Sequence, residues 1–126
     1  MNIDIVVSEK APAAIGPYSQ AVKVGDFIFC SGQIPLDPAT GEIVSGDVSA
    51  QAEQVMSNIA AVLAAAGVGF DRAVKSTIYL VDMADFAAVN EEYGRCFPGH
   101  KPARSTVAVA ALPRGARVEI ELVAVI

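Results

Sequence analysis

Residues 73–97, with the sequence AVKSTIYLVDMADFAAVNEEYGRCF, combine the two patterns from which the rest of the fold can be worked out. Over residues 73–81 the side chains alternate between two faces, with Ser76, Ile78 and Leu80 on one of them. This period of two predicts a β-strand. Asp82 is suited to cap the helix that follows, and apolar residues recur at helical spacing over about residues 84–97. The segment therefore predicts a strand that leads directly into a helix.

Toward the N-terminus, short strands are predicted at residues 3–7, 21–24 and 27–31. Gly25-Asp26 supplies a two-residue hairpin between the last two strands, and residues 11–20 form an ordered irregular loop. Asp47 caps a helix over residues 48–66, which ends at Gly67. Toward the C-terminus, strands are predicted at residues 105–110 and 117–125. The order β-β-β-α-β-α-β-β predicts one α/β (α+β) domain over residues 1–126, with two helices on one face of a six-stranded sheet.

The other face of that sheet is predicted to be too apolar to meet water. It would present Tyr79, Val81, Val123 and Val125, and the whole chain is 53% hydrophobic with a mean hydropathy of +0.45. Stacking this face against further copies of the chain would bury it. We therefore expect a homo-oligomer.

The bulk composition weighs against several classes of function without excluding a local nucleic-acid site. The net charge is −5 and no run of basic residues occurs, which argues against binding of a nucleic-acid backbone. The N-terminus lacks the positive charge of a signal peptide and no apolar stretch reaches 18 residues, so a cytoplasmic protein without a membrane segment is expected. Cys30, Cys96 and His100 have no metal-site spacing, and both cysteines are predicted to be buried apolar residues.

The strongest chemical signal is an arginine that follows a stiff turn. Pro102 restricts the backbone before Arg104, and a guanidinium can bind a carboxylate with two parallel hydrogen bonds. Glu119 and Glu121 lie on the last strand at positions that the pattern predicts to be largely buried. Either these charges serve an active site, or Arg104 and a glutamate form a structural ion pair.

Three further residues have two possible roles each. Tyr18 either lines a site or anchors its loop through a backbone hydrogen bond. Gly32 permits a close approach of the backbone to a ligand, or a bulge. Asn90 lies at the edge of the apolar helix face, where its amide either holds the loops around Arg104 or Ser31-Gly32 or contacts a ligand.

Five segments together resemble the Rid family, formerly called YjgF, in order and over nearly the whole chain. They are residues 15–21 (IGPYSQA), 30–35 (CSGQIP), 85–90 (DFAAVN), 102–106 (PARST) and 118–121 (VEIE). The resemblance implies a chorismate-mutase-like subunit with a mixed sheet, assembled as a homotrimer with clefts between subunits. It also implies hydrolysis of reactive 2-imino and enamino acids, such as 2-iminobutanoate and 2-iminopropanoate, to 2-keto acids and ammonia, with no cofactor and no metal.

The resemblance also assigns roles to individual residues. Arg104 matches the arginine that binds the substrate carboxylate, and Glu119 matches the acid that positions or activates water. The positions around the same cleft are matched by Tyr18, Ser31, Gly32, Asn90 and Thr106. Many bacterial relatives have cysteine where this chain has Thr106, so covalent catalysis by a thiol is not expected there, and only the Thr106 backbone would contact the imine.

Two other functions remain open at the level of sequence. Some relatives have been described as ribonucleases or translation inhibitors, although the acidic composition weighs against activity on RNA. A non-catalytic trimer that binds keto acids, or a holdase-like protein, would use the same cleft without turnover.

Overall fold

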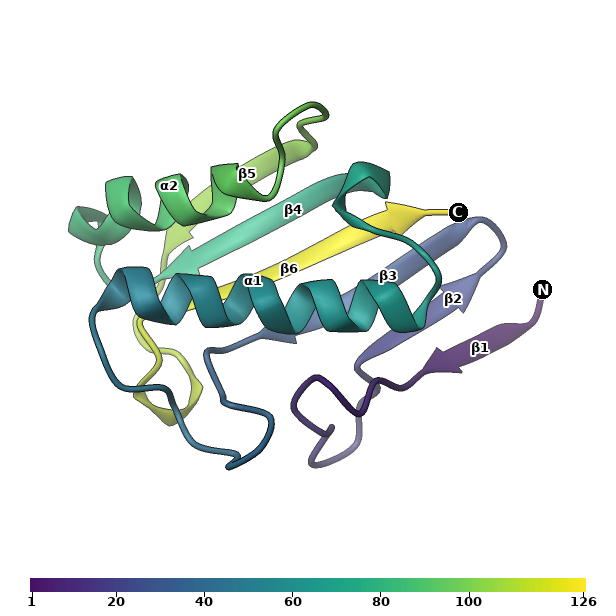
Figure 1. Ribbon diagram of the computed structural model, residues 1–126, viewed down its shortest axis with the longest axis horizontal. Helices are drawn as coiled ribbons and strands as arrows, with labels where there is room; N and C mark the ends of the chain where they lie inside the picture. The colour runs from purple at the N-terminus through teal and green to yellow at the C-terminus, as the bar shows by residue number, and fades with distance from the viewer.

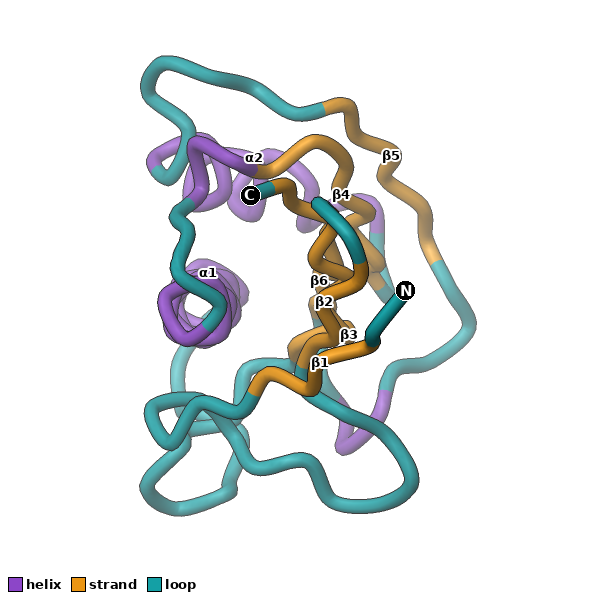
Figure 2. Tube along the Cα trace, turned by 90° about the vertical axis from the view of Figure 1, so that its right-hand side faces the viewer, coloured by secondary structure: helices purple, strands orange, loops and turns teal.

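Six strands form one mixed sheet and two α-helices cover one of its faces, as the sequence predicts (Figures 1 and 2). The computed structural model describes residues 1–126. The strands lie in the order β1-β2-β3-β6-β4-β5. Their bounds are β1 (Ile3–Val6), β2 (Ala21–Val24), β3 (Phe27–Gln33), β4 (Ala73–Leu80), β5 (Ala103–Ala108) and β6 (Val118–Val125). All neighbouring strands are antiparallel except β4 and β5, which run parallel.

Helix α1 (Val48–Ala65) begins and ends where its capping residues predict. The Asp47 carboxylate accepts a hydrogen bond from the Ala50 N–H at 3.0 Å, and Gly67 follows the helix with a φ of +86°. The predicted apolar face is buried, but Gln51 and Asn58 are buried with it. Their amides bond to backbone groups of other segments, since Asn58 donates to the Leu36 carbonyl at 3.0 Å and Gln51 accepts from the Arg117 N–H at 2.9 Å.

Helix α2 (Phe86–Arg95) connects β4 to β5 and lies over them. Asp82 accepts a hydrogen bond from the Ala84 N–H at 2.9 Å, as expected of a cap, but the turn it caps is a 3-10 helix over Met83–Asp85. The α-helix is therefore shorter than predicted at both ends. Phe97 lies beyond the helix and is still buried.

The predicted start of β5 was wrong by two residues. The strand begins at Ala103, so Arg104 is itself a strand residue paired with Ser76 of β4. The alternation of apolar residues that marks a strand is weak here because β5 is an edge strand whose outer residues are exposed.

The face of the sheet opposite the helices is uncovered in the subunit (Figure 2). Phe27 and Phe29 of β3 are 48% and 45% exposed there, next to Val125 and Val123 of β6. These residues are the apolar face that the sequence predicts. We refer to this side of the sheet as the open face.

The two cysteines differ from each other, and the prediction that both are buried holds for only one. Cys30 is buried, and its burial raises the pKa of the thiol to about 12. Cys96 is half-buried, because it follows α2 on the side turned toward an outer groove shared with Glu92 and Arg95.

Candidate functional site

Arg104 lies on the helix side of the sheet, where α2 holds its guanidinium from above. Its Nη1 donates to the Asn90 Oδ1 at 2.6 Å. Its Cζ lies 5.1 Å from the centre of the Tyr93 ring and 5.5 Å from that of Phe86. Stacking on two aromatic rings and one hydrogen bond fix the plane of the guanidinium. Most of its donors stay unused, and no carboxylate of the subunit pairs with it.

The ring below Arg104 is itself anchored in the sheet. The Tyr93 hydroxyl and the Ser76 hydroxyl lie 2.6 Å apart in a buried hydrogen bond, and Ser76 is the β4 residue opposite Arg104. Burial raises the pKa of Tyr93, so the phenol stays neutral. The support of Arg104 therefore continues through Tyr93 into the central part of the sheet.

A cavity of about 410 Å³ opens beside Arg104. Its lining contains two cations, Arg104 and Lys101, and no acidic residue. The Lys101 amine donates to the Phe97 carbonyl at 2.9 Å, which keeps it near the end of α2. An anion of the size of a small carboxylic acid fits both the charge and the volume of this cavity.

Thr106 follows Arg104 on the same side of β5. Its hydroxyl oxygen is buried and has no hydrogen-bond partner in the subunit. The contact of the Thr106 backbone with a ligand stays a prediction.

Glu119 lies on the open face, because its neighbours Val118 and Ile120 point into the core. Its carboxylate lies against Gly32 of β3. A Cβ atom built on Gly32 would come within 2.1 Å of the Glu119 Oε2. Only glycine leaves room for this carboxylate, so Gly32 serves a close approach and also lies in the irregular β3–β6 pairing between Cys30 and Gln33.

Electrostatics also distinguish Glu119 from an ordinary surface acid. Burial and, second, the negative charge of Glu121 raise the pKa of Glu119. A carboxyl group with a raised pKa accepts a proton more readily at neutral pH than an exposed glutamate does.

Ser31 lies next to Gly32 on β3 and contacts the loop over residues 11–20, which carries Tyr18. The Ser31 hydroxyl donates to the Ser19 carbonyl at 2.6 Å, so it ties that loop to β3. Tyr18 is 54% exposed and its hydroxyl makes no hydrogen bond in the subunit, which does not agree with a loop anchor.

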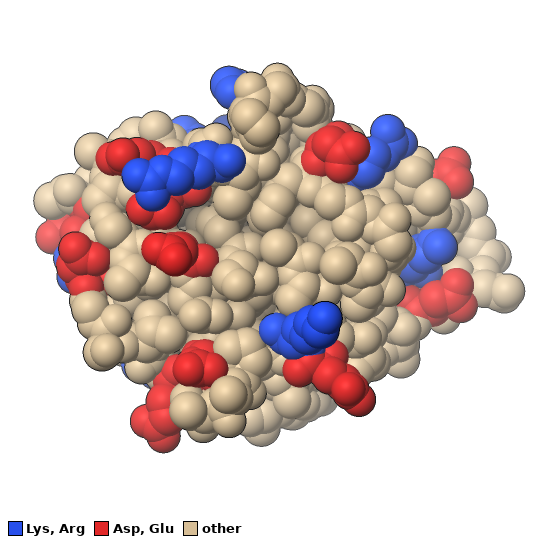
Figure 3. All heavy atoms as spheres, viewed as in Figure 1, with Lys and Arg blue, Asp and Glu red and all other residues tan.

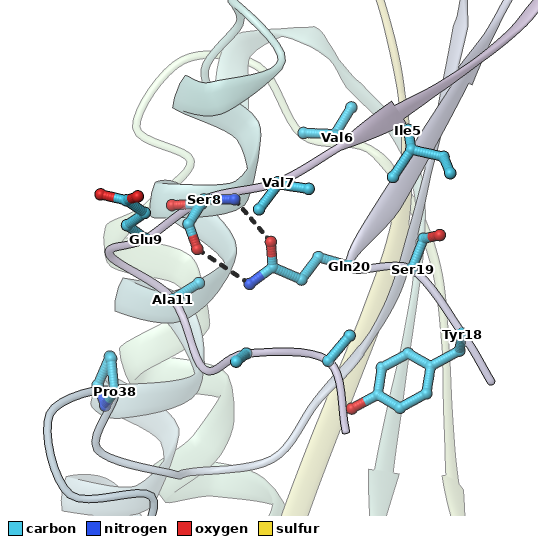
Figure 4. A pocket seen from close by; sticks show the side chains of 12 residues that line it. Ile5, Val6, Val7, Ser8, Glu9, Ala11, Tyr18, Ser19, Gln20 and Pro38 are labelled. Carbon is cyan, nitrogen blue, oxygen red and sulfur yellow. Dashed lines mark hydrogen bonds between the residues drawn. The ribbon is translucent and has the colours of Figure 1, made fainter. Parts of the chain in front are cut away.

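Tyr18 also lines a cavity of about 510 Å³ at the start of the chain (Figure 4). Gln20 dominates its interior, but the Gln20 amide is fully engaged. It accepts from the Ser8 N–H at 2.6 Å and donates to the Ser8 and Pro12 carbonyls. We interpret this cavity as the inner side of a loop anchored by Gln20, and we place the chemistry elsewhere because its lining contains no cation that could bind a carboxylate.

The predicted residues thus form two groups rather than one. Asn90, Arg104 and Thr106 lie on β5 and α2 on the helix side of the sheet, whereas Glu119 lies on the open face against Gly32 of β3. Ser31 precedes Gly32, and Tyr18 lies on the loop that the Ser31 hydroxyl contacts. Arg104 and Glu119 do not form an ion pair within the subunit, where Arg117 pairs with Asp85 and Arg95 with Glu91 and Glu92.

Several supporting residues were not predicted as part of a site. Phe86 and Tyr93 were expected in the core, and their spacing with Asn90 on one helix face was the available signal. Lys101 carried no signal beyond its charge. Tyr79, whose hydroxyl donates to Glu121, was predicted only as an apolar residue of the open face.

Three observations bear on the class of ligand and on the setting of the protein. No group of three or more His, Cys, Asp or Glu side chains could hold a metal ion. On the face that carries the helices, acidic and basic side chains are scattered without a continuous basic area (Figure 3). No helix has both the length and the hydropathy needed to cross a membrane.

Comparison with known proteins gives consistent matches over the whole fold. The family described as endoribonuclease L-PSP matches residues 8–126. Protein DfrA of Myxococcus xanthus is 63% identical over 120 residues, which cover 94% of this chain and 92% of that protein. The 2-iminobutanoate/2-iminopropanoate deaminase of mouse is 53% identical over 121 residues, covering 96% of this chain and 90% of the mouse protein. A crystal structure of a conserved Rid-family protein from Yersinia pestis superposes with a TM-score of 0.97 at 45% identity, covering 99% of this chain and 100% of that one.

Proposed function

Because the chain belongs to the Rid (YjgF) family, also described as endoribonuclease L-PSP, we propose that it hydrolyses 2-imino acids to 2-keto acids and ammonia. The substrates we propose are 2-iminobutanoate and 2-iminopropanoate, after the mouse relative named for that activity. The observation that carries the proposal is Arg104. Its guanidinium is oriented by Asn90 and two aromatic rings, borders a cavity, and has no carboxylate partner in the subunit.

Assembly into a homotrimer would bring the two groups of site residues together. The Arg104 group and the Glu119 group lie on different sides of one sheet, so a substrate that touches both needs two subunits. The exposed Phe27 and Phe29 of the open face supply apolar surface for such contacts. Light scattering should give about three times the subunit mass of 13.0 kDa. A stable monomer at micromolar concentration would refute this arrangement.

The proposed chemistry uses two residues in distinct roles. Arg104 binds the carboxylate of the imino acid and so orients its C2. Glu119 accepts a proton from water as the new C–O bond forms at C2, while the electrons of the C=N bond move to nitrogen, which takes up a proton from solvent. The C–N bond of the resulting carbinolamine then breaks as Glu119 returns its proton to the departing nitrogen. The carbinolamine hydroxyl loses its proton to solvent as the C=O bond forms, and the keto acid and ammonia leave. General acid–base help of this kind contributes roughly 10²–10⁴-fold.

A coupled assay tests the activity directly. An amino-acid oxidase generates the imine, and formation of the keto acid is followed with and without the protein. We expect acceleration by the wild type and its loss in Arg104→Ala. Arg95→Ala is the matched control, because Arg95 is an exposed arginine on the same connection that pairs only with Glu91 and Glu92.

The outcomes separate the three candidate functions. If the folded wild type does not accelerate imine hydrolysis but binds a keto acid saturably, the protein is a non-catalytic binding protein. Cleavage of RNA by the same highly purified sample would favour the ribonuclease that the family description names. The net charge of −5 supports the imine activity over that one.

A further inference from the structure

Two glutamates stand side by side on the open face, and the proposed mechanism uses only one of them. Glu119 and Glu121 lie two residues apart on β6, so both side chains leave the same side of the sheet at a spacing of about 6.6 Å. Strand β4 runs antiparallel beside them, with Tyr79 opposite Glu119 and Thr77 opposite Glu121.

Tyr79 does not bond to the glutamate directly across from it. Its hydroxyl donates to the Oε1 of Glu121, the residue opposite Thr77 in the pairing of β4 with β6. Such diagonal contacts are within reach of aromatic side chains. The Glu119 carboxyl, by contrast, takes part in no hydrogen bond within the subunit and lies against Gly32. The two acids therefore differ in their environment, although their positions on the strand are equivalent.

We propose that Tyr79 and Glu121 form a positioning pair that makes Glu119, and not Glu121, the carboxyl that holds and returns the proton during imine hydrolysis. The hydrogen bond from the Tyr79 hydroxyl fixes the place of the Glu121 carboxylate. The negative charge of Glu121, on the same face of the same strand, disfavours a second charge at Glu119. The inference rests on the proposed function and deepens it by adding two residues to the site.

The pKa shifts of Tyr79 and Glu119 agree with the hydrogen bond from Tyr79 to Glu121 and with the placement of the two glutamates. The hydrogen bond to Glu121, followed by burial, raises the pKa of Tyr79, so the phenol remains a donor. Burial first, and then the charge of Glu121, raise the pKa of Glu119.

The other charged groups near the pair are engaged elsewhere. Lys75 of β4 lines a shallow hollow together with Glu121, and its amine donates to the Ser105 Oγ at 3.3 Å. Arg117, just before β6, pairs with Asp85 at 2.8 Å. Strand β3 brings only uncharged residues to this side of the sheet, as does β5. Glu121 is thus the charge that acts on Glu119 within the subunit.

The test uses Glu121→Gln in the intact oligomer, because glutamine keeps the shape and an acceptor for the Tyr79 hydroxyl. Carbon NMR of the Glu119 carboxyl gives its titration midpoint without any need for activity. We expect the midpoint to move to lower pH, and the acidic limb of the kcat/KM profile to move with it. Glu53→Gln is the control, since it removes the same charge from an exposed position on α1 and should move neither.

Tyr79→Phe provides a second, independent variant. Without the phenol, Glu121 loses the hydrogen-bond donor that fixes its carboxylate, so the Glu119 midpoint should move from its wild-type value. A Glu119 midpoint that stays at the wild-type value in both Glu121→Gln and Tyr79→Phe would overturn the proposal.

The NMR midpoint of Glu119 and the kcat/KM profile also separate the role of the Tyr79–Glu121 pair from the proposed imine hydrolysis. A midpoint that moves while the kcat/KM limb stays fixed would overturn the assignment of Glu119 as proton carrier. Absence of imine turnover in the wild type would refute the proposed function, and the NMR titration would still decide whether the pair controls the protonation of Glu119.

Discussion

The Arg104 guanidinium is held by contacts with neighbouring side chains, whereas the Glu119 carboxylate occupies space left free because Gly32 has no side chain. Asn90, Phe86 and Tyr93 surround the guanidinium with one hydrogen bond and two ring contacts. The Glu119 carboxylate instead fills the space that a Cβ on Gly32 would occupy. Support from several contacts can be weakened in steps, because each contact contributes only part of it. A side chain added at position 32 would instead force the Glu119 carboxylate to move as a whole.

The largest effect that tests the difference between the Arg104 and Glu119 regions is expected for Glu119→Gln, which keeps the shape of the side chain and removes the proton acceptor. We expect turnover to fall by roughly 10²–10⁴-fold, while the affinity for a 2-keto acid changes little. Steady-state kinetics and keto-acid titrations on the same preparation check this. Near-normal turnover would show that the Glu119 region does not supply the proton transfer, and Glu53→Gln controls for the loss of one charge.

Gly32→Ala tests the fit around Glu119 without changing any charged group. The new Cβ would lie 2.1 Å from the Glu119 Oε2, so the carboxylate must shift. A displacement of about 1 Å at a reacting group can cost on the order of 10²-fold in turnover. Gly99→Ala is the matched control, because a Cβ there meets nothing within 4 Å. Equal kinetics for the two variants would contradict the role of Gly32.

Arg104→Lys tests the other region, where we expect a graded loss. Lysine keeps the charge but not the planar pair of donors. Loss of one charge-assisted hydrogen bond of about 1.5–3 kcal/mol corresponds to a roughly 10–150-fold weaker affinity for a keto acid. Thermal stability should stay close to wild type, since Arg104 has no ion pair in the subunit. A large drop in the melting temperature would instead indicate a structural ion pair across subunits.

The sequence was sufficient for the elements whose pattern is local. The strand over β4, the caps Asp47 and Asp82 and the apolar face of α1 depend on residues within one or two turns of each other. The start of β5 was missed because an exposed edge strand does not need alternating apolar residues.

The arrangement of the site was less accessible, for a different physical reason. The residue types of Arg104, Asn90 and Glu119 could be chosen from chemistry and from the family resemblance. Their division between two sides of the sheet follows from strand order and register, which are set by contacts far apart in the chain. The hydrogen bond from Tyr79 to Glu121 spans 42 residues and depends on that register.

A smaller effect is expected in the pH dependence of stability. The pKa of Glu119 is raised in the folded state, so the native protein binds this proton more tightly than the unfolded chain. The stabilising contribution is fully present below the unfolded pKa of about 4.3 and is lost as the pH rises through the folded pKa. Glu119→Gln should therefore gain stability relative to wild type on going from pH 4 to pH 7. The gain is on the order of 1 kcal/mol or less, because solvent screens this half-buried group. Melting curves at equal protein concentration check it, and a relative loss over that range would contradict the sign.

The smallest effect on turnover is expected at Thr106, which borders the Arg104 region without supporting its guanidinium. Thr106→Val keeps the β-branched shape and removes a hydroxyl that is buried and unpaired. Leaving such a group unsatisfied costs about 1–3 kcal/mol, so the variant should be at least as stable as wild type. Turnover should stay within about tenfold, since only the backbone of Thr106 is proposed to face the imine. Thr106→Ser is the complementary control, because it keeps the hydroxyl and loses the methyl group. Activity that is lost in Thr106→Val and kept in Thr106→Ser, with both proteins folded, would show that the hydroxyl turns toward the substrate in the assembled protein. In that case the Arg104 region would depend on more than the contacts made by its guanidinium.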